Sequence, residues 1–127
     1  MFVCFSSFNT LTSSRLIFTG WIPQDKVLNL YGKSSITVVP SLWEEPFGRT
    51  SLEASANGCA VIITNRGGLP ETVTNAKILR NLSVKNLERA LNELIKKNFL
   101  KKKLQYHSIK NFYLSHKFIS NLIDNYR

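Results

Sequence analysis

The sequence of 127 residues has no apolar run of the roughly 20 residues that a membrane-spanning helix needs. It has only two cysteines, Cys4 and Cys59, which are not spaced as metal ligands. The apolar opening, residues 1–14, lacks a charged start and a small-residue cleavage site, so we do not expect a signal peptide. We therefore expect a cytoplasmic chain with free thiols, in which Cys59 is buried as a small hydrophobic residue.

The sequence also lacks internal repeats and low-complexity linkers, and its length suits one domain. What it has in excess is positive charge, with 17 Lys and Arg against 8 Asp and Glu. The excess is uneven: residues 1–79 carry six basic and five acidic side chains, whereas residues 80–127 carry eleven and three. A basic half of this kind is compatible with nucleic acid, an anionic membrane surface or no partner at all.

Short apolar runs alternate with amphipathic segments along the chain. Strands are expected at 15–20, 35–41, 60–64 and 77–80. Helices are expected at 23–32, at 49–57, from Pro70, from Val84 and over 99–125. This order predicts an α/β fold: a Rossmann-like parallel sheet with helices on both faces. The strand at 15–20 would form an exposed edge, which favours self-association or pairing with a missing strand.

Ligands of such sheets bind beyond the carboxyl ends of the strands. The loop that follows the second expected strand ends in Pro46 and Gly48, so the next helix should start only near Arg49. Glu45 then lies on the loop, free to fold over the helix start, and Glu53 lies about one turn inside the helix. We expect the two carboxylates to bracket one ligand from two sides.

The helix start between these carboxylates offers unpaired backbone N–H groups from about Gly48 to Ser51, together with the positive end of the helix dipole. This arrangement suits phosphate, and Gly48 lets a ligand approach the backbone closely. Gly67 and Gly68 would let the next loop close on the same ligand. A nucleotide diphospho-sugar has the matching shape, with phosphate in the middle and hydroxyl-rich groups at both ends.

The stretch "VVPSLWEEPFGRTSLEASANGCAVIITNRGGLPE" resembles the signature of the group 1 glycosyltransferases, the family 4 of retaining, nucleotide-sugar-dependent enzymes with the GT-B fold. The resemblance covers about residues 15–125 and implies an incomplete C-terminal, donor-binding domain at 15–127, with 1–14 unassigned. Seven residues separate Glu45 from Glu53, as in the family motif, so Glu44 is taken as a neighbour of the motif.

The resemblance implies a role for each motif residue. Glu45 would be catalytic, lying beside the donor sugar and stabilising an oxocarbenium-like transition state. Glu53 would bind the ribose hydroxyls of the nucleotide. The backbone N–H groups of Phe47 and Gly48 would face the sugar.

The diphosphate would be held by the backbone N–H groups of Arg49 and Thr50. Arg49 and Arg66 are the only basic residues near the expected site, and neither stands where the family keeps an Arg and a Lys for the diphosphate. Together with Gly67 and Gly68, these residues complete the expected donor-binding set.

No metal ion or other cofactor is implied beside the nucleotide diphospho-sugar substrate, and His107 and His116 are expected on the surface. The expected partners are this donor and a glycan or lipid-linked acceptor, the latter compatible with peripheral contact at the cytoplasmic membrane face. The family's amino-terminal domain and the start of its donor domain have no counterpart in the sequence. We therefore expect a fragment that is inactive alone, with the rest supplied by a missing amino-terminal domain or a partner chain.

Two other functions compete with this one. The same α/β core would serve a non-catalytic module that binds a nucleotide or another anion. Alternatively, the stretch 96–117, "KKNFLKKKLQYHSIKNFYLSHK", interleaves lysines with Phe99, Tyr106, Phe112 and Tyr113, which suits nucleic-acid or membrane-surface binding. At helical spacing we instead expect these aromatic residues in the core and the lysines on a solvated face, so nucleic acid is not the expected partner.

Overall fold

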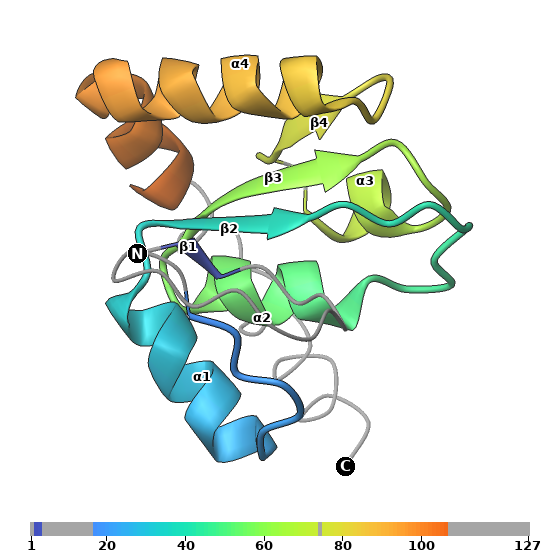
Figure 1. Cartoon of the computed structure of the whole chain (residues 1–127), viewed down its shortest axis with the longest axis vertical. Helices are drawn as coiled ribbons and strands as arrows, with labels where there is room; N and C mark the ends of the chain where they lie inside the picture. Colours follow the sequence, from blue (N-terminus) through green and yellow to red (C-terminus); the bar gives the residue numbers. More distant parts are fainter. Residues whose placement is uncertain (1, 4–16, 74, 107–127) are drawn as a thin grey trace, which may run out of the picture.

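A computed structural model describes residues 2–3, 17–73 and 75–106, which form a parallel sheet with helices on both of its faces (Figure 1). The strands lie in the order β1-β2-β3-β4. Their bounds are β1 Phe2–Val3, β2 Ile36–Val39, β3 Ala60–Thr64 and β4 Lys77–Leu79. Each neighbouring pair is parallel, with Thr37 opposite Val61 and Ile63 opposite Ile78.

Parallel neighbours require crossover connections, and helices supply them. Their bounds are α1 Gln24–Lys33, α2 Arg49–Ala56, α3 Leu69–Thr72 and α4 Val84–Lys96. Helical residues resume at 98–106, after a break at Lys97. Within the described ranges, no helix is long and apolar enough to cross a membrane.

The core has one layer on each side of the sheet. Successive residues of a strand point to opposite faces, and both faces of β2 and β3 are buried. The layer under α1, α2 and α3 contains Tyr31, Val39, Ala54, Val61, Ile63 and Leu69. The layer under α4 contains Ile36, Val38, Ala60, Ile62, Ala90 and Leu94. The predicted α/β sheet with helices on both faces is confirmed, and Figure 1 shows α4 on the opposite side of the sheet from α1 and α2.

The expected first strand, at 15–20, is wrong in its described part. Residues 17–20 are irregular and exposed, and Gly20 has a φ of +60°, a left-handed conformation that breaks a strand. Phe2–Val3 pairs with β2 in its place, so the edge of the sheet is β1 and lies in a segment that the sequence left unassigned. Residues 15 and 16 lie outside the described residues.

The predicted burial is confirmed for Cys59 and wrong for two aromatic residues. Cys59 is a free, fully buried thiol that donates to the carbonyl oxygen of Tyr31 at 3.2 Å, as expected of a small core residue. Phe99 and Tyr106 are 81% and 62% exposed, so the expectation that they lie in the core is wrong. Outside the described residues lie Cys4, His107, His116, Phe112 and Tyr113, and the helix expected beyond 106.

Candidate functional site

The start of α2 lies beyond the carboxyl end of β2, as the sequence predicts. Gly48, the residue before the helix, has a φ of +75° and is buried against Leu69, which a Cβ would meet at 2.6 Å. The first backbone hydrogen bond of the helix runs from Leu52 N to Gly48 O at 3.2 Å. The three N–H groups of residues 49–51 therefore have no carbonyl acceptor inside the helix and face outward from its positive end.

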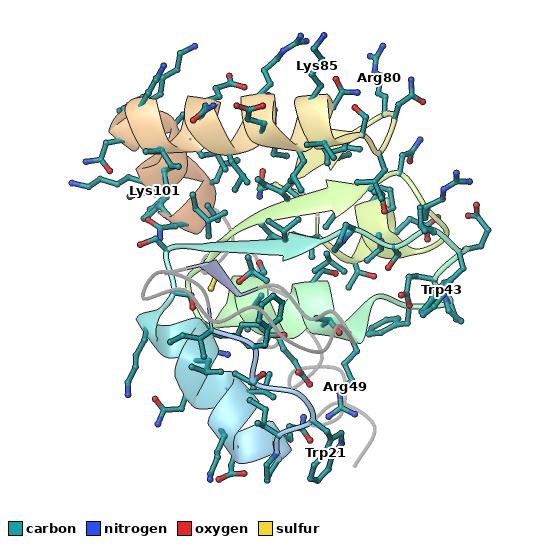
Figure 2. The ribbon with its side chains drawn as sticks, viewed as in Figure 1. Trp21, Trp43, Arg49, Arg80, Lys85 and Lys101 are labelled. Atoms are coloured by element: carbon teal, nitrogen blue, oxygen red, sulfur yellow. The ribbon has the colours of Figure 1, made fainter. Side chains whose placement is uncertain are left out.

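A cleft of about 730 Å³ opens beside this helix start. Its walls come from the segment before α1, from α1 itself, from the end of β2 with the following loop, and from α2. The lining residues are Trp21, Ile22, Gln24, Val27, Tyr31, Val38, Val39, Pro40, Ser41, Leu42, Trp43, Glu45, Arg49, Thr50 and Glu53. Figure 2 shows Trp21, Trp43 and Arg49 on the side of the molecule toward which β2 and β3 run.

Glu53 meets the cleft with its carboxylate already oriented. Its Oε1 accepts hydrogen bonds from Arg49 Nε at 2.6 Å and from Gln24 Nε2 at 2.9 Å, so α1 and α2 both hold it. The Glu53 side chain is 21% exposed and that of Arg49 is 70% exposed. A carboxylate has about four acceptor positions, so these two contacts leave capacity for ligand hydroxyls.

Glu45 reaches the same cleft from the loop. Its Oε1 accepts a hydrogen bond from Ser41 Oγ at 2.8 Å, and the residue is half-buried. The carbonyl oxygen of Ser41 accepts in turn from Thr64 Oγ1 at 2.8 Å, which ties the loop to the end of β3. The loop that carries Glu45 is therefore fastened to the sheet rather than free to fold over the helix.

Gly67 and Gly68 press directly against that loop. Gly67 has a φ of +52°, and a Cβ there would lie 2.6 Å from Glu45 N and closer still to Glu45 O. A Cβ on Gly68 would lie 2.8 Å from Pro46 O. The backbone N–H of Gly68 donates a hydrogen bond to Glu45 O at 2.7 Å. Contact between two backbone segments thus explains why this turn contains two glycines.

Glu44 joins the same two loops from the solvent side. Its carboxylate accepts a hydrogen bond from Arg66 Nη1 at 3.1 Å and another from the Gly67 N–H. The Arg66 hydrogen bond first, and the Gly67 backbone second, lower the pKa of the Glu44 carboxyl below its usual range. Arg66 is therefore paired with Glu44, which the sequence analysis took only as a neighbour of the motif.

Tyr31 lies at the floor of the cleft, from α1. It is 1% exposed, and burial, followed by the nearby charge of Glu53, raises the pKa of its phenol to about 12. The phenol is therefore neutral at physiological pH beside the Glu53 carboxylate.

Comparison with known proteins identifies the family. The profile described as "Glycosyl transferases group 1" matches residues 6–111, which is most of the chain. The chain belongs to the group 1 glycosyl transferases. Among its relatives, the Bacillus subtilis protein YtcC is 45% identical over 58 residues, which are 46% of this chain and 14% of that protein.

Another relative of this group 1 glycosyl transferase is the serotype-specific mannosyltransferase WbdA of Escherichia coli, 31% identical over 100 residues. Those residues are 78% of this chain and 12% of WbdA. The structure resembles sucrose-phosphate synthase of Thermosynechococcus elongatus with a TM-score of 0.68 at 22% identity, over 89% of this chain and 31% of that one. This likeness confirms the GT-B type of fold. The chain thus spans a minor part of the length of each of these proteins.

The structure brings only part of the expected donor-binding set to the cleft of this glycosyl transferase. Glu45, Arg49, Thr50 and Glu53 line it together. The other expected residues, Phe47, Gly48, Arg66, Gly67 and Gly68, are not among its lining residues. Their contacts with a donor stay predictions, as do those of the four that line the cleft.

Sequence reasoning missed the side of the cleft formed by Trp21, Gln24 and Tyr31. These residues precede Glu45 by 14 to 24 positions, and only the packing of α1 beside α2 brings them to the motif. The signal available was the apolar face of α1, which places Val27 and Tyr31 against the core. Within the described ranges, no group of three or more His, Cys, Asp and Glu residues is arranged to hold a metal ion.

The close approach at Gly67 predicts a large cost for Gly67→Ala. The new Cβ would overlap the Glu45 backbone and occupy a left-handed conformation, so the free energy of unfolding should fall by about 2–3 kcal/mol. Gly32→Ala in α1 is the control, because its Cβ meets nothing within 4 Å, and it should change that free energy by less than about 1 kcal/mol. Urea unfolding measures both, and equal effects would contradict the backbone contact.

The raised pKa of Tyr31 predicts a loss of stability at high pH. The folded state holds this proton more tightly than the unfolded chain, whose tyrosine pKa is about 10, so the contribution is complete below that pH and is lost as pH rises toward about 12. Between about pH 9 and about pH 11 the free energy of unfolding should fall by about 1 kcal/mol more in the wild type than in Tyr31→Phe. Tyr106→Phe, at an exposed site, should behave as the wild type.

Proposed function

We propose that the cleft beside α2 is the donor site of a retaining glycosyltransferase that uses a nucleotide diphospho-sugar. The sugar, of the hexosyl type, would pass to a glycan or a lipid-linked acceptor. Family membership supports transferase activity, and a hexosyl donor is supported by the mannosyltransferase among the relatives. We propose this activity for the complete enzyme, because the chain spans only part of the length of those relatives.

One observation carries the proposal: two carboxylates from different elements line one cleft with a helix start between them. Glu45 comes from the loop and Glu53 from the second turn of α2, and Arg49 and Thr50 line the same cleft at the first turn. A ligand with one phosphate-rich centre and a hydroxyl-rich group at each end satisfies all of these groups at once. A simple anion would offer no hydroxyl group to either carboxylate.

The chemistry follows from where charge develops. When the bond between the sugar carbon and the diphosphate oxygen breaks, negative charge accumulates on the departing diphosphate and positive charge on the sugar ring. The outward N–H groups at the start of α2 and the Arg49 guanidinium would stabilise the first charge, because they are held before the reaction begins. The Glu45 carboxylate would stabilise the second, and its hydrogen bond from Ser41 holds it in position.

Glu53 would bind the ribose, and its present partners fit that role. Arg49 and Gln24 neutralise and orient the carboxylate while leaving it partly exposed to the cleft. The neutral phenol of Tyr31 below it excludes water from that end. The proposal therefore assigns the nucleoside to the α1 side of the cleft and the sugar to the loop side.

Titration calorimetry with UDP-, GDP- and ADP-sugars tests this assignment with Glu53→Gln. Loss of a charged hydrogen bond to a ribose hydroxyl should weaken binding of the preferred nucleotide sugar by about 10- to 100-fold. Inorganic pyrophosphate should bind the variant as tightly as the wild type or more tightly, because the change removes a negative charge and releases Arg49. Glu88→Gln on α4, whose carboxylate is remote from the cleft, is the matched control and should bind both ligands as the wild type does.

The alternative, a general anion-binding module, predicts a different pattern. Pyrophosphate and nucleotide sugars would then bind alike, and Glu53→Gln would not separate them. The absence of nucleotide-sugar binding to the folded chain would likewise contradict a working donor site in this chain.

A further inference from the structure

The outer face of α4 carries a stripe of cations. The helix packs on the sheet through the buried residues Ala90 and Leu94. At about 100° per residue, Lys85, Arg89 and Lys96 point away from that side, within about 40° of one another, along about 16 Å of helix. All three are exposed. Their stripe is called the basic face here.

The basic face is not neutralised by the acidic residues around it. Described residues 80–106 contain eight basic and two acidic side chains. One of the two, Glu93, already pairs with Lys77 at 2.7 Å and with Lys97 at 3.9 Å. The other, Glu88, is exposed about 60° around the helix from Lys85 and forms no ion pair within the described residues. Within the described part of the chain, no ion pair involves Lys85, Arg89 or Lys96. The charge is therefore available to an anionic partner.

One neighbouring cation, Arg80, extends the surface. Arg80 precedes α4, and Figure 2 shows Arg80 and Lys85 pointing away from the sheet above the start of the helix. Arg80 and Arg89 also line a pocket of about 230 Å³ together with Asn81, Asn86, Lys77 and Glu93. The Glu93 carboxylate in this pocket is paired with Lys77 at 2.7 Å. Two guanidinium groups and two amides can donate to the oxygens of one phosphate.

Exposed apolar side chains flank the basic face. Val84 and Ile95 lie about 20° apart on one side of the helix, roughly a quarter turn from the cations, and are 86% and 52% exposed. Phe99, three residues beyond the end of α4, is 81% exposed. Aliphatic groups beside cations stabilise binding when they enter the boundary between lipid headgroups and acyl chains. A nucleic-acid backbone offers no apolar surface that would bury them.

We propose that α4 binds an anionic phospholipid surface through this basic face, with Val84 and Ile95 entering the headgroup region. The side chains of Arg80 and Arg89 would take a headgroup phosphate. The cations, the apolar flank and the Arg80–Arg89 pocket, all on or beside the outer side of one helix, carry the proposal.

The arrangement of the fold lets this surface act without blocking the cleft. α4 covers the layer of Ile36 and Ile62, while the cleft opens at the carboxyl end of β2 beside α1 and α2, and no residue of α4 lines it. A bilayer lying against α4 therefore leaves the cleft open to solutes. Lipid binding and donor binding are independent events, and either can fail without the other.

Co-sedimentation of the full chain with phosphatidylcholine vesicles, with and without phosphatidylglycerol, tests the proposal. We expect binding only to the vesicles that contain phosphatidylglycerol, weakening steeply as salt shortens the Debye length to about 8 Å at physiological ionic strength. Equal binding to neutral vesicles, or none to either, would overturn the proposal.

A matched pair of double variants separates the basic face from net charge. Lys85→Gln with Arg89→Gln should lower the partition coefficient about 25-fold, at about fivefold per charge near the surface. Lys26→Gln with Lys33→Gln removes the same charge from exposed positions on α1 and should change it less than about twofold. Equal losses in the two variants would show that net charge alone drives binding and would contradict the assignment. Circular dichroism melting checks that both variants fold.

The apolar flank supplies a test against nucleic acid. Ile95→Ser should weaken vesicle binding about fivefold, because less apolar area enters the headgroup region, and should leave binding to a single-stranded RNA unchanged. A chain that binds this RNA more tightly than anionic vesicles, with Ile95→Ser neutral in both assays, would replace the membrane by nucleic acid as the partner of α4.

Discussion

The close contact between the Gly67–Gly68 turn and the backbone of Glu45 and Pro46 is the constraint on which the site depends. No side chain fits between these segments, since a Cβ at either glycine would overlap the opposing backbone. Three hydrogen bonds reinforce the contact. The Gly68 N–H donates to Glu45 O, Thr72 Oγ1 donates to Phe47 O, and Arg66 donates to the Glu44 carboxylate. The loops after β2 and β3 therefore form one unit, and the position of Glu45 is set by backbone packing.

This unit explains how a loop carboxylate can have a fixed place relative to a helix carboxylate. Gly48 ends the loop in a left-handed conformation against Leu69, which directs α2 away from the sheet edge and leaves its first N–H groups facing outward. Glu53, one turn later, is held from α1 by Gln24. Three elements thus converge on one cleft, and each contributes a group that a donor with a charged centre and polar ends requires.

Much of the fold could be predicted because local patterns and tertiary packing agree. The unbroken apolar run Ala60–Thr64 is β3 with the expected bounds, and Pro23 and Gly48 stand before α1 and α2 as expected. The run at 15–20 misled because a short apolar stretch has no period of its own, and Phe2–Val3 pairs with β2 instead. Which of two short segments joins an edge is decided by tertiary pairing that the local pattern does not contain.

The candidate site was predictable in its motif and not in its surroundings. The spacing of Glu45 and Glu53 and the start of α2 follow from Pro46 and Gly48, which are local signals. The link from Glu44 to Arg66 and the contribution of Tyr31 depend on side chains more than 20 residues away. Likewise, Phe99 is exposed although its spacing suits a core, because the helix breaks at Lys97 and the following turn has a new orientation.

The most direct measurement is a backbone amide NMR titration of the full chain with the nucleotide sugar that binds most tightly. If the diphosphate binds at the start of α2, the amide signals of Gly48, Arg49, Thr50 and Ser51 should shift together with those around Glu45. All of these shifts should follow one common dissociation constant. The amide signals of α4 should not shift. Shifts confined to α4, or no shift at the start of α2 under saturating ligand, would contradict the account of the cleft as a donor site.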